Sequence, residues 1–128
     1  MDIKNIVEKF WNDINSQNWE NLSSYFKEGA VINWDNTNES FNVQEFIKAN
    51  SEYPGDWLMD IKKLVVADMR NEVISVVRVF LKDKNISFHA VSFFKFDSEK
   101  IEKLNEYWGI DVDAPQWRVD MKIGRKIK

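Results

Sequence analysis

Four long strand-like segments follow one another in the second half of the chain, with only turn residues between them. They cover residues 57–69, 73–82, 86–97 and 101–108, and the turns at 83–85 and 98–100 are short. Short connections join antiparallel neighbours, whereas parallel strands need a long crossover. The four segments therefore predict an antiparallel meander. The alternation of apolar and polar residues is interrupted near Lys62 and Lys63, which indicates a β-bulge in the first strand.

The first half of the chain has the periodicity of helices. Apolar residues recur every three or four positions from Ile3 to Ile14, a pattern typical of an amphipathic helix. Three helices are expected, from a cap at Asp2 to residues 16–18, from a cap at Asn18 to Gly29, and from Asn42 to residues 53–55, with a strand at 30–34 and a polar loop at 35–39. Asn42 has Glu45 three residues later, the spacing of a capping box. Helices gathered before a meander indicate an α+β fold, with three N-terminal helices on one face of a curved antiparallel sheet.

A chain of 128 residues fits a single domain. We expect it to span residues 1–118, followed by a basic tail at 119–128. Apolar residues make up 44% of the chain, with six Trp and nine Phe, which is enough for a core and for an aromatic-lined cavity. The tail holds four Lys or Arg and one Asp, a local charge of +3, so the other residues sum to −6. This negative charge argues against a surface that binds the phosphates of a nucleic acid, and no nucleic-acid partner is expected.

Several kinds of site are disfavoured by residue type. The chain has no cysteine and one histidine, which argues against a zinc site and excludes disulfides. Its four glycines are scattered, so no glycine-rich phosphate loop exists. We therefore expect neither a metal nor a cofactor.

The start of the chain lacks the pattern of a signal peptide, and no apolar stretch approaches the ~20 residues of a membrane span. A cytoplasmic protein without a membrane partner is expected.

One face of the last two strands combines aromatic and polar side chains. A three-residue loop at 98–100 would pair Ser92 with Glu106, Ala90 with Trp108, and Phe94 with Leu104. Successive residues of a strand point to opposite faces, so these six residues share one face. Apolar walls with a few polar groups are the usual lining of a ligand cavity. The pattern predicts a pocket for a small hydrophobic molecule.

Glu106 is the candidate acid or base of this pocket. Next to Trp108 and Phe94 the pKa of its carboxyl should rise, which would give a general acid or base near neutral pH. Two structural alternatives stay open. Glu106 could pair with a buried Arg78 or a lysine, or a bulge could turn it outward.

Two further residues are candidate catalytic partners. His89, the only histidine, falls by strand parity on the face opposite Glu106, where a structural histidine at an interface is the alternative to an acid/base role. Asp35 follows Trp34 at the expected pocket rim. A one-residue shift would bring Asp35 inward, and capping of the loop is its alternative.

The opposite face of the sheet is also apolar. Val91, Phe93 and Tyr107 alternate with the pocket residues, and a continuous apolar face is rarely left in water. Because all three helices are placed on the first face, a second copy of the chain is the simplest cover. We predict a homodimer through the convex side of the sheet.

Two stretches of the sequence resemble one superfamily. FFKFDSEKI at 93–101, running on to EYWG at 106–109, is similar to the final hairpin of nuclear transport factor 2-like proteins, and best to the SnoaL-like and ketosteroid isomerase-like branches. YFKEGAV at 25–31 resembles the end of their first third. The resemblance covers most of residues 1–118 and implies a cone-like roll, often dimeric, with its pocket between the concave sheet and the helices. The superfamily includes isomerases, cyclases, dehydratases, epoxide hydrolases and non-catalytic adaptors, so it implies no single reaction.

The same resemblance shows that the catalytic residues of ketosteroid isomerases are absent. Ketosteroid isomerases place a tyrosine on the first helix, a base aspartate at the end of the first strand and a second acid on the fourth strand. The matching positions here are Phe10, Trp34 and Ser92. Phe10 has no proton to donate, Trp34 is not a base, and Ser92 is a weaker donor than a protonated carboxyl. Trp108 matches a pocket-lining aromatic residue of that family.

The sequence thus favours a SnoaL-like protein that binds a small hydrophobic molecule. The residues expected to line the pocket are Phe10, Trp34, Tyr53, Trp57, Ser92, Phe94 and Trp108, and core packing is the alternative for Tyr53 and Trp57. A lyase, isomerase or cyclase reaction would use Glu106, with Asp35 or His89 as candidate partners. The alternative is a non-catalytic ligand-binding or protein-interaction module of the same fold.

Overall fold

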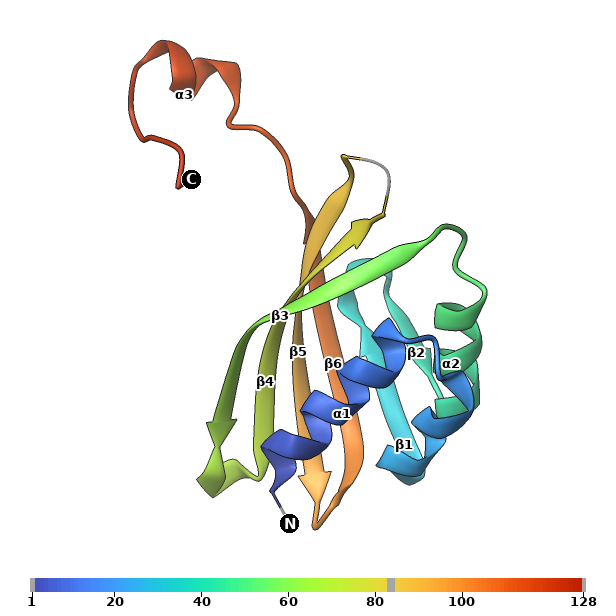
Figure 1. The fold of residues 1–128 in the computed structure, drawn as a ribbon. Helices are drawn as coiled ribbons and strands as arrows, with labels where there is room; N and C mark the ends of the chain where they lie inside the picture. Colours follow the sequence, from blue (N-terminus) through green and yellow to red (C-terminus); the bar gives the residue numbers. More distant parts are fainter. Residues whose placement is uncertain (1, 83–84, 128) are drawn as a thin grey trace.

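The computed structural model describes residues 2–82 and 85–127 of the chain. Its elements, in chain order, are α1 (Ile3–Asn15), the 3-10 helix η1 (Trp19–Tyr25), β1 (Phe26–Trp34), the 3-10 helix η2 (Asp35–Thr37), β2 (Glu39–Phe41), α2 (Val43–Ser51), β3 (Trp57–Ala67), the 3-10 helix η3 (Asp68–Arg70), β4 (Glu72–Leu81), β5 (Ser87–Asp97), β6 (Lys100–Ile110) and α3 (Gln116–Asp120). Figure 1 shows the first helices in front of one large sheet. No helix in the described parts of the chain combines the length and apolar character needed to cross a membrane.

The first helix forms as its apolar pattern predicts. The Asp2 carboxylate accepts a hydrogen bond from the Lys4 amide and so caps α1. The buried side chains of α1 are Ile6, Val7, Phe10, Trp11 and Ile14. Figure 1 shows α1 lying across the sheet, so its apolar stripe becomes the centre of the core.

The second predicted helix is much shorter than expected. Only Trp19–Tyr25 is helical, and β1 begins directly afterwards. The predicted helix end at Gly29 and strand start at residue 30 are therefore wrong. Gly29 lies inside β1 with φ +81°, where the register of β1 against β6 shifts. A left-handed φ suits glycine, so Gly29 makes a bulge instead of ending a helix. Asn18 precedes η1, but its side chain donates to Asp13 and makes no cap bond.

The loop predicted at residues 35–39 turns directly into a short strand. Asn38, with φ +56°, forms the turn, and β2 then pairs antiparallel with the end of β1. Three residues are too few to give a recognisable alternation, so the sequence pattern does not show β2. The next helix, α2, begins as predicted. Asn42 Oδ1 accepts from the Glu45 amide, and Glu45 Oε1 accepts from the Asn42 amide, both at 2.9 Å, which is a complete capping box.

The six strands form one sheet in the order β2-β1-β6-β5-β4-β3. The meander β3 to β6 is antiparallel as predicted, and its bulge lies between Ile61 and Lys63. The pair β1–β6 is parallel, so the sheet is mixed and mostly antiparallel, and the expected α+β fold class is confirmed with this one parallel pair added. These two strands are joined through the rest of the fold, so no tight turn sets their direction. Asp83 and Lys84 of the predicted turn lie outside the described residues.

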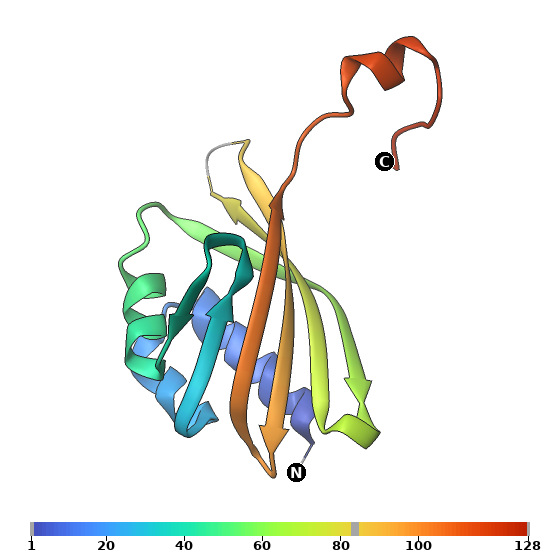
Figure 2. The same ribbon diagram turned by 180° about the vertical axis from the view of Figure 1, so that it is seen from behind.

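The helices before β3 all cover one face of this sheet. Figure 1 shows α1, η1 and α2 on that face, and Figure 2 shows the opposite face with no helix over it. The predicted pairs Ser92–Glu106, Ala90–Trp108 and Phe94–Leu104 are confirmed. Their buried side chains point toward the helices. The expected α+β arrangement, with N-terminal helices packed on the concave face, is therefore present.

Beyond β6 the chain leaves the body of the molecule. Residues 111–127, here called the C-terminal arm, extend past the end of β6 and carry α3. Both views show the arm on the side away from α2. The helix α3 includes residue 118, where the sequence places the end of the domain, and the predicted basic tail begins within it. Lys128 of that tail lies outside the described residues.

Candidate functional site

Glu106 lies in a row of side chains that crosses three adjacent strands. Its register partner on β1 is Trp34, and its partner on β5 is Ser92. Strand parity turns all three side chains to the face covered by the helices. The sheet therefore brings together an indole, a carboxylate and a hydroxyl that lie far apart in the sequence.

Both carboxylate oxygens of Glu106 have hydrogen-bond donors. Trp34 Nε1 donates to Oε1 at 3.0 Å, and Ser92 Oγ donates to Oε2 at 2.6 Å. Glu106 is 6% exposed and Ser92 is fully buried. The alternative ion pair with Arg78 does not form, because the Arg78 guanidinium lies over the Phe80 ring at 4.6 Å, and both residues belong to the opposite set of the β4 alternation. Nor does a bulge turn Glu106 outward.

Burial raises the pKa of the Glu106 carboxyl above its usual 4.5, and the hydrogen bonds from Ser92 and Trp34 oppose that rise. Desolvation is the larger effect, because two neutral donors replace only part of the water that stabilises a carboxylate in solution. A carboxyl with a raised pKa can hold or release a proton closer to neutral pH than an exposed one. The expected direction of the pKa shift therefore agrees with the structure.

A cavity of about 590 Å³ opens beside Glu106, within the range of small-molecule sites. Five of the six tryptophans line it: Trp11, Trp19, Trp34, Trp57 and Trp108. The rings of Trp34 and Trp108 meet edge to face with centroids 5.3 Å apart. No lysine, arginine or histidine is among its described lining residues. The cavity is thus aromatic, with a single carboxylate.

The loop between α2 and β3 forms one side of the cavity mouth. Tyr53 and Trp57 stack there with ring centroids 5.3 Å apart, and Trp57 Nε1 donates to the Pro54 carbonyl at 2.8 Å. Gly55 has φ +111°, and a Cβ on it would lie 2.7 Å from Trp57 Nε1 and 2.8 Å from Leu81 Cδ1. Only glycine combines that backbone conformation with so close an approach. Gly55 therefore sets the position of the two rings at the mouth.

The structure places the residues singled out from the sequence in five different surroundings. Those that line the cavity are Trp34, Tyr53, Trp57, Glu106 and Trp108. Phe10 and Phe94 are fully buried in the core, outside the cavity lining. Ser92 is buried and reaches Glu106. His89 faces the other side of the sheet, with Nδ1 2.5 Å from Asp111 Oδ1, and Asp35 is exposed in η2.

The structure also adds residues that the sequence does not single out for the site. Trp11, Trp19, Phe46 and Phe88 line the cavity. Trp11 belongs to the apolar stripe of α1, which indicates core packing and gives no sign of a cavity. Its Nε1 donates to the buried Ser75 Oγ at 3.0 Å. That contact spans 64 positions, so no local sequence signal could reveal it. Across residues 2–82 and 85–127, no group of three or more His, Cys, Asp or Glu is placed to hold a metal ion.

No family model matches this sequence, and no curated protein matches it. Solved structures do match the fold. A candidate ketosteroid isomerase from Kribbella flavida is 18% identical, with a TM-score of 0.82 over 98% of this chain and 90% of its own. An NTF-2 like protein of unknown function from Burkholderia xenovorans is 15% identical, with a TM-score of 0.79 over 98% of this chain and 95% of its own.

A third similar structure belongs to an enzyme of ring formation. It is the epoxide hydrolase/cyclase-like enzyme SalBIII of pyran ring formation in the polyether salinomycin, 18% identical, with a TM-score of 0.70 over 84% of this chain and 90% of its own. The matches that cover 98% of the chain extend into the C-terminal arm. At these identities the likeness establishes the fold, and the resemblance noted in the sequence is confirmed at that level.

Proposed function

We propose that this chain, which has the nuclear transport factor 2-like fold, binds a small hydrophobic molecule in the cavity beside Glu106. The observation that carries the proposal is the lining, in which five tryptophans surround one carboxylate. Aromatic rings supply a large apolar contact area, and one polar group suffices to fix the orientation of a ligand. An anionic ligand would meet Glu106 with no cation among the described lining residues to balance it. The cavity therefore suits a neutral or cationic ligand.

Glu106 is also the group that would move a proton in this cavity. When protonated it donates a hydrogen bond to a ligand oxygen, and when ionised it accepts a proton from a ligand carbon or hydroxyl. An isomerisation moves a proton within one substrate, so a single carboxyl that takes it up and returns it completes the reaction. The candidate isomerase and the cyclase-like enzyme among the similar structures are consistent with chemistry of this kind. We propose an isomerase, lyase or cyclase activity on this basis.

A non-catalytic binding function is the second candidate, and one observation favours it. Both hydrogen-bond partners given for the Glu106 carboxylate, Trp34 and Ser92, are neutral groups that do not titrate near pH 7. Asp35 and His89 lie outside the described cavity lining. A cavity that only binds needs no second acid or base. Substitution of Glu106 by Gln separates the two functions, since loss of turnover with retained binding marks catalysis.

Ligand binding can be measured with a matched pair of probes, neutral 2-naphthylmethanol and anionic 2-naphthoate. Quenching of tryptophan fluorescence should show the neutral probe binding at least roughly tenfold more tightly, because the anion meets an uncompensated carboxylate. Trp57→Ala should weaken binding of the neutral probe about tenfold, since it removes one aromatic wall at the mouth. Met69→Ala, at a fully exposed position, is the control. Equal affinity for both probes, or no effect of Trp57→Ala, would contradict the proposed ligand class.

We also propose a homodimer through the convex face of the sheet. Phe93 and Tyr107 lie on that face with ring centroids 6.0 Å apart, and Tyr107 is 41% exposed. No described helix covers them. An apolar face of this kind is typical of a protein–protein contact.

Light scattering at micromolar concentration should give about twice the chain mass of 15.2 kDa. Tyr107→Lys should weaken this contact and lower the apparent mass toward that of one chain on dilution, because a lysine buried between two apolar faces loses its hydration. Met69→Lys, in η3 just beyond the end of β3, should leave the dimer intact. A monomeric mass for the unmodified chain would refute this interface.

A further inference from the structure

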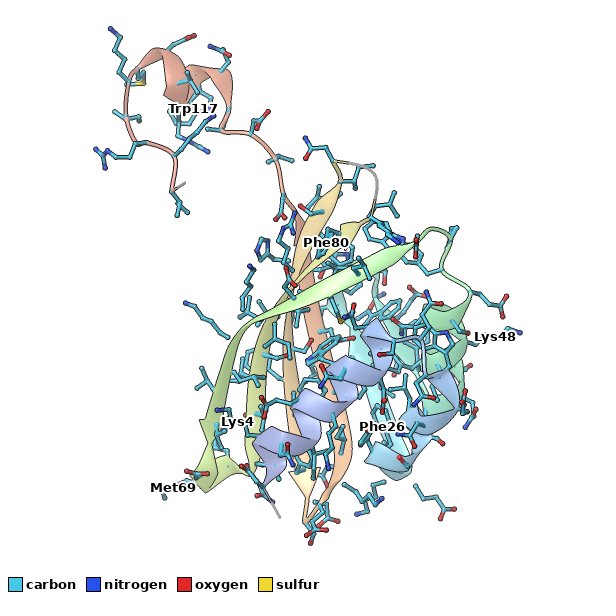
Figure 3. The ribbon with its side chains drawn as sticks, in the orientation of Figure 1. Lys4, Phe26, Lys48, Met69, Phe80 and Trp117 are labelled. Carbon is cyan, nitrogen blue, oxygen red and sulfur yellow. The ribbon has the colours of Figure 1, made fainter. Side chains whose placement is uncertain are left out.

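The C-terminal arm exposes apolar side chains that its own domain does not cover. The exposed apolar residues of the arm are Val112, Trp117, Val119, Met121, Ile123 and Ile127. Trp117 is 58% exposed, and Figure 3 shows it on the arm, well clear of the sheet. The hydrogen bonds of α3 and the turn after it join arm residues to one another, such as the Met121 amide to the Trp117 carbonyl. The arm is therefore locally ordered, with its apolar side chains in solvent.

The base of the arm is fixed at the edge of its own cavity, which Ile110 and Ser87 line. The Asp111 amide donates to the Ser87 carbonyl at 3.0 Å, which extends the pairing of β5 and β6 by one residue. The Asp111 carboxylate accepts from Ser87 Oγ at 2.6 Å and lies 2.5 Å from His89 Nδ1. These contacts hold Asp111 toward the convex side, because His89 is on that face. The arm then continues on the side away from α2 and its following loop.

The charges of the arm and of the cavity mouth are opposite. Residues 116–127 hold four Lys or Arg and one Asp, a formal charge of +3. Residues 19–56, which run from η1 to the mouth loop, hold seven acidic side chains and two lysines, a formal charge of −5. Three exposed carboxylates directly adjoin cavity-lining residues: Glu20 next to Trp19, Glu52 next to Tyr53, and Asp56 next to Trp57. Complementary charge steers association and selects the partner surface.

The mouth also matches the arm in its apolar character. Tyr53 at the mouth is 52% exposed and Ile86 is 51% exposed, and both line the cavity. On the arm, the Arg118 guanidinium lies 5.2 Å from the Trp117 ring centroid, so an aromatic and a cationic group are presented side by side. The stacked pair Tyr53 and Trp57, with Glu52 and Asp56 next to it in the chain, is a surface that such a segment fits.

We propose that the C-terminal arm of one copy of this chain covers the cavity mouth of a second copy. The path of the arm on the side away from α2 disfavours its own mouth loop, and the charge of residues 19–56 selects the same surface on another copy. Two copies that exchange arms form a closed pair, because each supplies one arm and one mouth. The inference goes beyond the proposed ligand binding and does not depend on any reaction at Glu106. It makes each cavity a composite of two chains.

Crosslinking tests the exchange directly, because the chain contains no natural cysteine. One copy carries Val119→Cys in the arm and one tag, and the other copy carries Ser51→Cys at the mouth and a different tag. After mixing, a short bismaleimide should join the two tags in one product. Met69→Cys, which Figure 3 places at the opposite end of the molecule, replaces Ser51→Cys as the control and should give at least about tenfold less product. Absence of the two-tag product, or an equal yield with Met69→Cys, would overturn the proposal.

A chain that carries both Val119→Cys and Ser51→Cys tests for closure within one copy. At high dilution, a crosslink found only inside single chains would also overturn the exchange. Charge reversal supplies a second readout. Lys122, Arg125 and Lys126 changed to Glu should reduce the two-tag product roughly tenfold, the combined effect of a few exposed ion pairs. Changing Glu20, Glu52 and Asp56 to Lys on the mouth copy should restore it, and failure to restore it would count against the mouth as the docking surface.

Discussion

Phe10→Ala should lower the free energy of unfolding by about 3–5 kcal/mol, the range for removal of a large buried side chain from a tight core. The Phe10 side chain is fully buried at the centre of an aromatic cluster. The rings around it are those of Trp11, Tyr25, Phe26, Phe46 and Phe94, with centroids 5.0 to 6.3 Å from its own. The free energy of unfolding of a small domain is about 5–15 kcal/mol, so this one substitution should remove a large part of it. Urea unfolding followed by circular dichroism measures it.

Phe10→Leu is the matched variant for that experiment. It retains most of the volume, so its cost should stay within about 1.5 kcal/mol. Because Phe10 lies outside the described cavity lining, the Leu variant should also bind the neutral naphthyl probe with unchanged affinity. A weakened affinity would mean that Phe10 contacts the ligand, as the sequence suggests. A small cost for Phe10→Ala would contradict its place at the centre of the core.

Glu106→Gln should stabilise the protein relative to the unmodified chain, by an amount that grows as pH rises above about 4.5. Burial raises the pKa of Glu106 in the folded state. Below the unfolded pKa the carboxyl is protonated in both states and imposes no penalty. As pH rises, the unfolded chain loses this proton first, so the free energy of unfolding falls until the folded pKa is passed. Each unit by which the pKa is raised corresponds to about 1.4 kcal/mol.

The Glu106→Gln variant should keep the local hydrogen bonds. The new amide oxygen can accept from Trp34 Nε1, and the new amide nitrogen can donate to Ser92 Oγ. The comparison therefore isolates the ionisation of Glu106. Unfolding in urea at intervals from pH 4 to pH 8 gives the difference between the two chains. A difference that stays flat over this range would show that the pKa of Glu106 is not raised. Ser92→Ala should extend the pH-dependent loss of stability to higher pH, because it removes a hydrogen bond that favours the charged carboxylate.

Strand alternation predicts only one of the two hydrogen-bond partners of Glu106. The short turn at 98–100 fixed the register of β5 against β6, and that register placed Ser92 beside Glu106. Its second donor, Trp34, arrives through the parallel pair β1–β6. No turn joins those strands, so the 72-residue separation of Trp34 and Glu106 hides their contact from any local pattern.

The other differences between the predicted and the observed structure also come from contacts between distant segments. Gly29 indicates a helix end because glycine commonly ends helices, but pairing with β6 overrides that tendency and makes it a bulge within β1. The strand β2 exists only because the end of β1 offers it a partner. Trp11 becomes a cavity residue because the cavity opens on the side of the α1 stripe nearest to Trp57 and Trp108.

By itself the sequence determined the features that depend on neighbouring residues. These are the caps of α1 and α2, the bulge in β3, the meander from β3 to β6 and the inward direction of Glu106. Such features follow from local hydrogen bonding and from the two-residue period of a strand. The tertiary structure alone decided the parallel placement of β1, the assembly of five tryptophans around one cavity, and the separation of Asp35 from Glu106. These depend on contacts between distant segments, whose energy comes from burial in the assembled core and leaves no periodic trace in the chain.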